Sequence, residues 1–325
     1  MEYVKLGNTG LDVSRICIGG MSFGDPDTWM HNWVLDEEES RVIIKKALDL
    51  GINFFDTANI YGLGASEEIL GRALRDYGKR DELVIATKVA GTMHDGPNGK
   101  GLSRKHIMQQ VDDSLERLET NYIDILYIHK WDYETPIEET MRALNDLVRA
   151  GKVHYLGASS MHTWQFQQAQ HIAEKNGWTK FVVMQNHYSL VYREDERELI
   201  NYCKETGVAL VPYAPLAAGR LARAWDADTK RSQEDKSARK KYDKTEESDR
   251  KIVQQVGKVA EKHDVTRAQI ALAWLWEKGV VAPIVGVTKE KYLDDFMGAM
   301  GVQLDPEDIE DLEKEYLPHE IVGHK

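Results

Sequence analysis

Eight short apolar runs alternate with longer amphipathic stretches along this chain, and that alternation limits the fold more than any other feature. The runs are mostly continuous and rich in β-branched or aromatic residues, as expected for strands buried on both faces of a parallel sheet. Eight such repeats match a (β/α)8 TIM barrel, whose usual size is about 250 residues. We therefore predict an α/β barrel in one domain spanning residues 1–325, with strands over Ile16–Gly19, Ile52–Phe55, Leu83–Thr87, Ile125–Ile128, His154–Gly157, Phe181–Met184, Ala209–Val211 and Pro283–Val285.

The stretches between the runs carry start and stop signals for helices. Asp36, with Glu39 three residues later, predicts a capped helix that ends at Gly51. Other helices are expected to begin at Ser66, Ser103 and Pro136, the last of them ending at Gly151, and to cover Tyr192–Thr206, Ser248–His263, Thr266–Glu277 and Pro306–Tyr316. Val4–Leu6 and Val13–Arg15 flank an Asn-Thr-Gly turn, which predicts an N-terminal β-hairpin.

A doubly wound open sheet is the alternative fold. That fold normally has a GxGxxG turn after its first strand, whereas Gly19–Gly24 lacks that spacing. Between strands seven and eight, Asp226–Lys251 forms a long insertion with 17 charged residues among 26. We expect a solvated surface helix or loop there, and the alternative is a flap at the barrel mouth that slows product release.

Composition excludes several classes of function. The 325 residues carry a formal charge of −12, which disfavours a generic nucleic-acid or anionic membrane surface. The two cysteines are far apart and no Cys/His cluster occurs, so no metal site is expected. Neither a secretory signal nor a run of 18 apolar residues is present, so the sequence predicts a cytoplasmic protein with no membrane span.

Polar side chains follow several of the predicted strands, at the end of a barrel where active sites lie. Asp56, Lys88 and His129 end strands two, three and four, and Tyr61 follows closely after Asp56. Each alone has a structural explanation, such as a helix cap or a solvated charge, but together they form a proton-transfer set. Tyr61 would donate a proton to a carbonyl oxygen, with Lys88 lowering the tyrosine pKa, Asp56 holding the ammonium and His129 orienting the carbonyl. The set has no electron source, so hydride must come from a cofactor.

These segments resemble the aldo-keto reductase family. The resemblance is carried by Phe55–Gly62, Ala86–Lys88, Tyr127–His129, Gly157–Ser160, Gln185–Tyr188, Tyr213–Gly219 and Pro283–Lys289, in the family's order. It implies a barrel that binds NADP(H) without a Rossmann fold, and a catalytic tetrad of Asp56, Tyr61, Lys88 and His129. Details of Arg220–Arg223 and Tyr316–His319 are most similar to the family's bacterial and fungal branches.

The resemblance also implies cofactor contacts. Ser159 and Gln185 would hold the nicotinamide carboxamide, Tyr213 would stack on its ring, and Lys289 would meet the 2′-phosphate. The remaining implied contacts are Ser160, Pro215, Leu216, Ala217, Gly219, Arg220, Gly286, Thr288, Tyr292 and Asp295. Ser160, Tyr292 and Asp295 differ from the family's usual Asn, Gln or Arg, and Glu, which favours a smaller preference for NADP over NAD.

The leading hypothesis is an NADP(H)-dependent reductase of small aldehydes or ketones. The alternative is a cofactor-binding regulatory subunit resembling potassium-channel β subunits. A barrel aldolase would need Lys88 as an amine nucleophile, which a neighbouring Asp56 opposes by keeping it charged. Trp29, Trp33, Trp131 and Trp225 are the candidate walls of an aromatic pocket that would favour aryl or apolar substrates.

Overall fold

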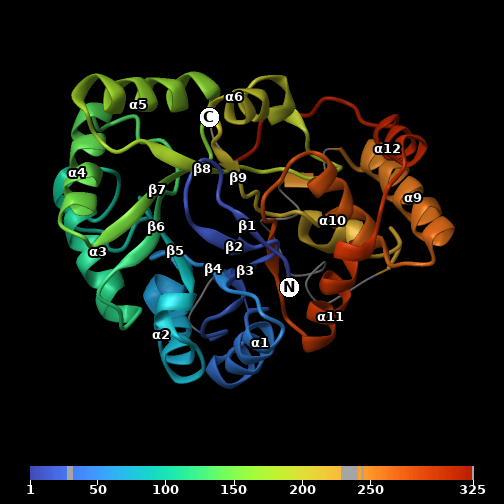
Figure 1. Cartoon of the computed structure of the whole chain (residues 1–325), viewed down its shortest axis with the longest axis horizontal. Coiled ribbons are helices and arrows are strands. Elements are labelled where there is room, and N and C mark those ends of the chain that lie inside the picture. The colour runs from blue at the N-terminus through green and yellow to red at the C-terminus, as the bar shows by residue number, and fades with distance from the viewer. Residues whose placement is uncertain (28–31, 228–240, 243–244, 324–325) are drawn as a thin grey trace.

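The computed structural model describes residues 1–27, 32–227, 241–242 and 245–323, and its centre is a parallel sheet (Figure 1). The strands occur in the spatial order β10-β3-β4-β5-β6-β7-β8-β9. Backbone pairing continues past the last strand, where Ile284 N donates to Pro212 O at 2.9 Å, so the sheet closes on itself as a (β/α)8 barrel. The strands are β3 (Cys17–Gly19), β4 (Phe54–Asp56), β5 (Val84–Val89), β6 (Ile123–Ile128), β7 (Val153–Ser159), β8 (Phe181–Gln185), β9 (Ala209–Leu210) and β10 (Ile284–Gly286).

Helices surround the barrel, and several begin at caps that the sequence encodes. The side chains of Asp36, Ser103 and Thr266 accept the backbone N–H three residues ahead, which satisfies one of the unpaired donors of each helix start. The described helices are α1 (Glu37–Asp49), α2 (Ala65–Tyr77), α3 (Arg104–Arg117), α4 (Ile137–Arg149), α5 (Thr163–Asn176), α6 (Leu199–Thr206), α9 (Glu246–His263), α10 (Arg267–Glu277), α11 (Glu290–Gly298) and α12 (Pro306–Glu313).

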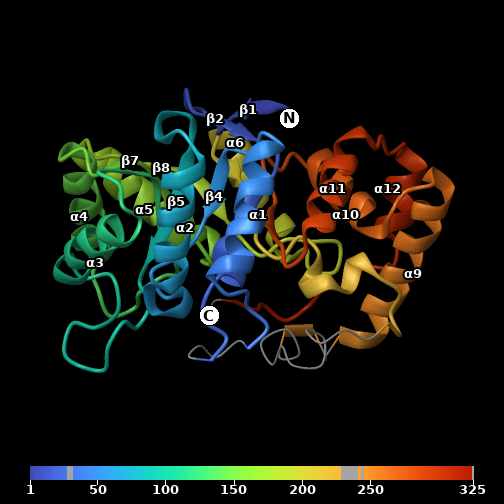
Figure 2. The same cartoon turned by 90° about the horizontal axis from the view of Figure 1, so that it is seen from below.

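A hairpin of β1 (Tyr3–Lys5) and β2 (Asp12–Ser14) covers the end of the barrel where the strands begin (Figure 2). Leu6 and Val13 from this hairpin are fully buried and join an apolar cluster with residues of the barrel interior such as Phe54 and Tyr127. The hairpin therefore closes the bottom of the barrel, and the polar ends of the strands lie at the opposite end.

The structure corrects some expectations. The helix expected to begin at Ser66 is α2, which begins one residue earlier at Ala65, and the Ser66 hydroxyl donates to Gly20 O at 2.7 Å. The helix expected over Tyr192–Thr206 is only α6, preceded by a 3-10 turn over Glu194–Arg197. Helix α5 was not expected at all.

The charged insertion Asp226–Lys251 is seen only in part. Residues 228–240 and 243–244 lie outside the described ranges, so the flap expectation cannot be placed on the structure. Its end, from Glu246, forms the start of α9. Among the described helices, none combines the length and the apolar character needed to span a membrane.

Candidate active site

Four side chains meet at the end of the barrel where the strands finish. Asp56 is the last residue of β4, Lys88 lies near the end of β5, and His129 follows β6 directly. Lys88 Nζ donates to the Asp56 carboxylate and to Thr57 O at 2.7 Å, and lies 3.4 Å from the Tyr61 hydroxyl. The rings of Tyr61 and His129 meet edge to face with centroids 5.8 Å apart. The structure thus brings together all four residues that the sequence suggested for proton transfer.

The electrostatics of this cluster favour the protonated forms of Lys88 and Tyr61. Burial alone lowers the pKa of Lys88, but the neighbouring Asp56 and Tyr61 outweigh it, so the pKa lies above its usual value and the amine stays charged. A charged Lys88 opposes the aldolase alternative. Burial raises the pKa of Tyr61, and Lys88 lowers it only in part, so the net shift is opposite to the expected lowering. The phenol therefore keeps its proton.

His129 is neutral in these surroundings. Burial lowers its pKa to about 3, and the positive charges of Lys88, Lys130 and Lys241 act in the same direction. A neutral imidazole can donate one hydrogen bond without carrying charge. This arrangement suits a group that orients a polar substrate atom near Tyr61.

An unusual turn follows Tyr61. Gly62, Leu63 and Gly64 all have positive φ values, of 59°, 51° and 106°. A Cβ on Gly64 would lie 2.6 Å from Cδ of Arg117, so the turn packs closely against α3. Arg117 in turn pairs at 2.7 Å with the fully buried Glu67 of α2. Glycine adopts positive φ without strain, so only Leu63 carries a backbone conformation that is costly, and such outliers are common at functional sites.

The residues expected to hold a nicotinamide also lie at this end of the barrel. Ser159 and Gln185 are the last residues of β7 and β8 and are paired in register. Gln185 Nε2 donates to Asp56 Oδ2 at 2.8 Å, an interaction that the sequence did not suggest. Ser160, next to Ser159, has φ 50°. Burial raises the pKa of Tyr213, and a hydrogen bond from the Ser160 side chain partly offsets that rise.

The loop after β9 contains several residues in the left-handed backbone region. Ala214, Ala217 and Ala218 have positive φ values of 55°, 47° and 55°, and Gly219 follows at 89°. Ala217 N donates to Ala214 O at 2.9 Å and Gly219 N donates to Leu216 O at 2.8 Å, so these residues close tight turns within the loop. The expected contacts Pro215, Leu216 and Ala217 are half-buried or buried within this loop, and Arg220 continues it.

The loop after β10 leads into α11. Gly286 and Lys289 are exposed, Thr288 is half-buried, and Lys289 stands at the N-cap position of α11. The Asp295 carboxylate accepts from the Thr266 hydroxyl at 2.7 Å, which ties it to the start of α10. Tyr292 stacks on Phe296 of the same helix.

The expected aromatic pocket is placed only in part. Trp29 lies outside the described residues, and Trp33 is buried in the protein. Trp131 stands two residues beyond His129, and its ring centroid is 6.1 Å from that of Trp164, which sequence reasoning had missed. The ring of Trp225 is covered by Arg250 at 5.7 Å. Of the four expected tryptophans, Trp131 is the nearest in sequence to a member of the tetrad.

Three further aromatic residues were not suggested by the sequence. His187 stacks nearly parallel on Tyr213, with centroids 5.2 Å apart, and on Tyr192, with centroids 4.1 Å apart. Tyr242 from the charged insertion lies 2.8 Å from His187 Nε2 through its hydroxyl. Only the Gln-Asn-His-Tyr segment that contains His187 gave any signal, through its resemblance to the family motif.

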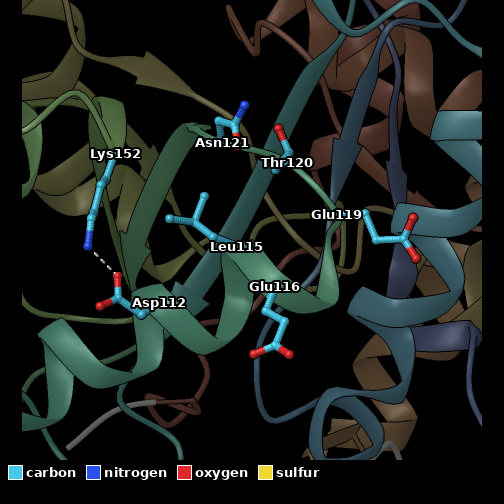
Figure 3. Close-up of a pocket in the computed structure, with 7 residues that line it drawn as sticks. All are labelled: Asp112, Leu115, Glu116, Glu119, Thr120, Asn121 and Lys152. Atoms are coloured by element: carbon cyan, nitrogen blue, oxygen red, sulfur yellow. Dashed lines mark hydrogen bonds and ion pairs between the residues drawn. The ribbon is translucent and has the colours of Figure 1, made fainter.

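A separate hollow is lined by the end of α3, the loop that leads to β6, and Lys152 before β7 (Figure 3). Because these segments precede strands, the hollow lies at the end of the barrel opposite the tetrad. It is shallow and mainly polar, and an ion pair between Lys152 and Asp112 at 2.5 Å crosses one side of it. The full lining is Asp112, Leu115, Glu116, Glu119, Thr120, Asn121 and Lys152. Its residues make no contact with the tetrad that would link the two places.

Comparisons with known proteins agree with this geometry. A family model described as the aldo/keto reductase family matches residues 15–316. Versiconal hemiacetal acetate reductase of Aspergillus parasiticus is 44% identical over 99% of this chain and 98% of its own length. An aldo-keto reductase of Alternaria alternata is 45% identical over 99% of this chain and 93% of its own. A putative aryl-alcohol dehydrogenase of Schizosaccharomyces pombe is 44% identical over 99% and 97%. These fungal relatives are all named as enzymes, which favours an enzyme over a regulatory subunit.

Proposed function

The chain belongs to the aldo/keto reductase family and is an oxidoreductase, and from this we propose that it is an NADPH-dependent reductase of aryl or apolar aldehydes and ketones. The observation that carries the proposal is the contact of Lys88 with both Asp56 and Tyr61, beside a neutral His129. Such a cluster can deliver one proton to a carbonyl oxygen and has no nucleophile of its own.

Members of this family typically use NADH or NADPH. The residues of this chain fit such a cofactor, because the loop after β9 lies at the end of the barrel where strands finish, where barrels commonly bind phosphate, and Arg220 supplies a cation in that loop. When bound, the reduced nicotinamide supplies the hydride that the side chains lack. Ser159 and Tyr213 would hold the nicotinamide end, and Lys289 would meet the 2′-phosphate.

The four side chains then have separate tasks. His129, neutral and edge-on to Tyr61, would donate a hydrogen bond to the carbonyl oxygen and orient it. Tyr61 keeps its proton until the oxygen becomes basic, and then donates it. Lys88 would stabilise the phenolate left on Tyr61, and Asp56 together with Gln185 holds Lys88 in place.

An aryl or apolar substrate class is supported by two observations. Trp131 lies two residues beyond His129 and packs near Trp164, so the loop that follows His129 carries aromatic surface. One relative is named as a putative aryl-alcohol dehydrogenase.

The proposal is tested by a substrate panel of aryl, aliphatic and anionic aldehydes and ketones, with NADPH and NADH in parallel. We expect the highest kcat/KM for apolar aryl aldehydes with NADPH. Absence of carbonyl reduction with either cofactor would overturn the proposed activity. A best rate with anionic aliphatic substrates would leave a reductase but reject the proposed substrate class.

A further inference from the structure

One buried tyrosine of the charged insertion contacts Arg220 in the proposed cofactor site and is linked to Tyr213 through His187. Tyr242 belongs to Asp226–Lys251, a segment so polar that the sequence suggested only surface, yet it is 3% exposed. A buried tyrosine needs a partner for its hydroxyl, and the partner here is His187 Nε2 at 2.8 Å. The side chain therefore has a fixed place at this end of the barrel.

The first of its two contacts leads to the proposed nicotinamide end. His187 is itself 3% exposed and follows β8, and its ring lies nearly parallel to Tyr213, with an interplanar angle of 8°. The Tyr242 ring meets His187 edge to face with centroids 5.7 Å apart. Because His187 is held by Tyr242 at one edge and stacked on Tyr213 across its face, the position of Tyr242 limits where the Tyr213 ring can lie.

The second contact leads to the proposed pyrophosphate loop. The guanidinium carbon of Arg220 lies 5.0 Å from the centroid of the Tyr242 ring, within the range of a cation–π interaction. Lys241, the preceding residue, places its ammonium 4.9 Å from the ring centroid of Tyr213. Of these two neighbouring residues of the insertion, Tyr242 contacts Arg220 in the pyrophosphate half of the proposed site, and Lys241 contacts Tyr213 in the nicotinamide half.

We propose that Tyr242 is a positioning residue that holds Arg220 and Tyr213 in the arrangement needed to bind the pyrophosphate and the nicotinamide of NADPH. This proposal rests on the proposed function, because it takes Arg220 and Tyr213 as cofactor contacts. Groups that are already ordered lose less conformational freedom on binding, so the consequence is tighter and longer-lived cofactor binding. Tyr242 itself need not touch the cofactor.

Two variants of the full-length protein separate its contacts. Tyr242→Phe removes only the hydroxyl that meets His187, and we expect NADPH affinity to fall by about two- to tenfold, the usual range for one hydrogen bond. Tyr242→Leu also removes the ring beside Arg220, and we expect a further loss of roughly twofold or more. Tyr188→Phe is the matched control, because it removes another buried tyrosine hydroxyl, bonded to Glu196, and should leave NADPH affinity unchanged.

Adenosine 2′-monophosphate distinguishes positioning from general loosening of the fold. This fragment carries the 2′-phosphate but has neither nicotinamide nor any phosphate of the pyrophosphate, so its affinity should be nearly equal in the wild type and both Tyr242 variants. Fluorescence or calorimetric titration of both ligands measures this. Equal weakening for NADPH and the fragment would mean a merely structural role, and unchanged NADPH affinity in Tyr242→Leu would mean no role, so either overturns the proposal.

The same titrations keep this inference apart from the proposed function. A wild-type chain that does not bind NADPH contradicts both. A wild-type chain that binds NADPH and reduces aryl aldehydes, with Tyr242 variants of equal affinity, contradicts only the role of Tyr242. A double-variant cycle with Arg220→Met adds a direct check: the loss caused by Arg220→Met should be smaller in the Tyr242→Leu background, and equal losses would show that Tyr242 does not hold Arg220.

Discussion

The imidazole of His129 is held neutral by its place in the protein, and this has a consequence for stability. Its pKa falls from 6.5 to about 3 in the folded chain, because burial and the charge of Lys88 disfavour the charged ring. Between those two values the unfolded chain binds more protons than the folded one. The free energy of unfolding therefore falls as the pH is lowered through this window.

Replacing His129 with Gln should remove that dependence. Between pH 7 and pH 5 we expect the wild type to lose roughly 1–2 kcal/mol more unfolding free energy than His129→Gln, from the slope of about 1.4 kcal/mol per pH unit for one proton. Denaturant unfolding at several pH values measures the difference. His171→Gln, at an exposed position on α5, is the control and should follow the wild type. Parallel curves for the wild type and His129→Gln would show that His129 is not held neutral.

Lys289 is the residue through which we expect the chain to read the 2′-phosphate. It is exposed at the N-cap position of α11, at the end of the loop that follows β10. A charge-assisted contact contributes about 1.5–3 kcal/mol, so NADPH should be preferred over NADH by roughly tenfold or more. Lys289→Met should remove most of that preference and leave NADH binding nearly unchanged, whereas Lys291→Met, two residues further on, should not. An unaltered NADPH/NADH affinity ratio in Lys289→Met, by fluorescence titration, would exclude this role.

The helices behind the site hold it through a buried ion pair. Glu67 of α2 is fully buried, pairs with Arg117 of α3 at 2.7 Å and accepts from the Thr87 hydroxyl at 2.5 Å. Thr87 precedes Lys88 on β5, and Arg117 packs against Gly64 at the end of the turn that follows Tyr61. The Glu67–Arg117 ion pair thus links β5, which carries Lys88, to the turn that follows Tyr61.

Arg117→Met should be strongly destabilising, because it leaves the buried Glu67 carboxylate without its cation. We expect a loss of about 3–5 kcal/mol in unfolding free energy. Adding Glu67→Gln to Arg117→Met should recover part of it, since the uncompensated charge is gone. Lys79→Met, which breaks an exposed pair with Glu82, should have little effect. Denaturant unfolding of the four proteins decides the matter, and equal small losses for Arg117→Met and Lys79→Met would contradict this role for the pair.

The elements themselves were largely predictable from sequence, for a physical reason. Strands buried on both faces give continuous apolar runs, so all eight barrel strands were found within a few residues of their observed bounds. Helix α5 was missed although Phe166, Ala169 and Ala173 have helical spacing, because the residues around them are mainly polar. Its end at Gly177, with φ 66°, is the signal that could have revealed it.

The tetrad was also predictable, because each member stands at or just after a strand end. Contacts across the barrel were not predictable, since no local pattern encodes them. Gln185 donates to Asp56, 129 positions away, and Tyr242 meets His187, 55 positions away. The burial of Tyr242 was not predictable for a further reason. One aromatic residue among 17 charged residues leaves the mean hydropathy of the segment polar.

One end of the barrel contributes mainly to stability, and the other end holds the residues proposed for the reaction. The hairpin closes the end where strands begin, through fully buried residues such as Leu6 and Val13, and the tetrad occupies the other end (Figure 2). A change at the closed end should therefore alter stability without altering the reaction.

Leu6→Ala tests this division. We expect a loss of roughly 2–5 kcal/mol in unfolding free energy, the usual cost of a cavity in a packed core, while kcat and KM of the folded protein stay near wild type. Val4→Ala, at a partly buried strand residue of the same hairpin, should cost less. Thermal unfolding and steady-state kinetics on the same samples are the measurement. A large fall in kcat in folded Leu6→Ala would show that the two ends are coupled.

Proton donation by Tyr61 is the step on which the proposed reductase depends. The direct measurement is the rate of reduction of a nitrobenzaldehyde by NADPH in Tyr61→Phe and in the wild type, with NADPH affinity measured on both proteins. Because the phenol is the proton donor beside Lys88, we predict that kcat/KM falls on the order of 10² or more while NADPH affinity changes by less than about twofold. Reduction at the wild-type rate by Tyr61→Phe would contradict the assignment of Tyr61 as the acid.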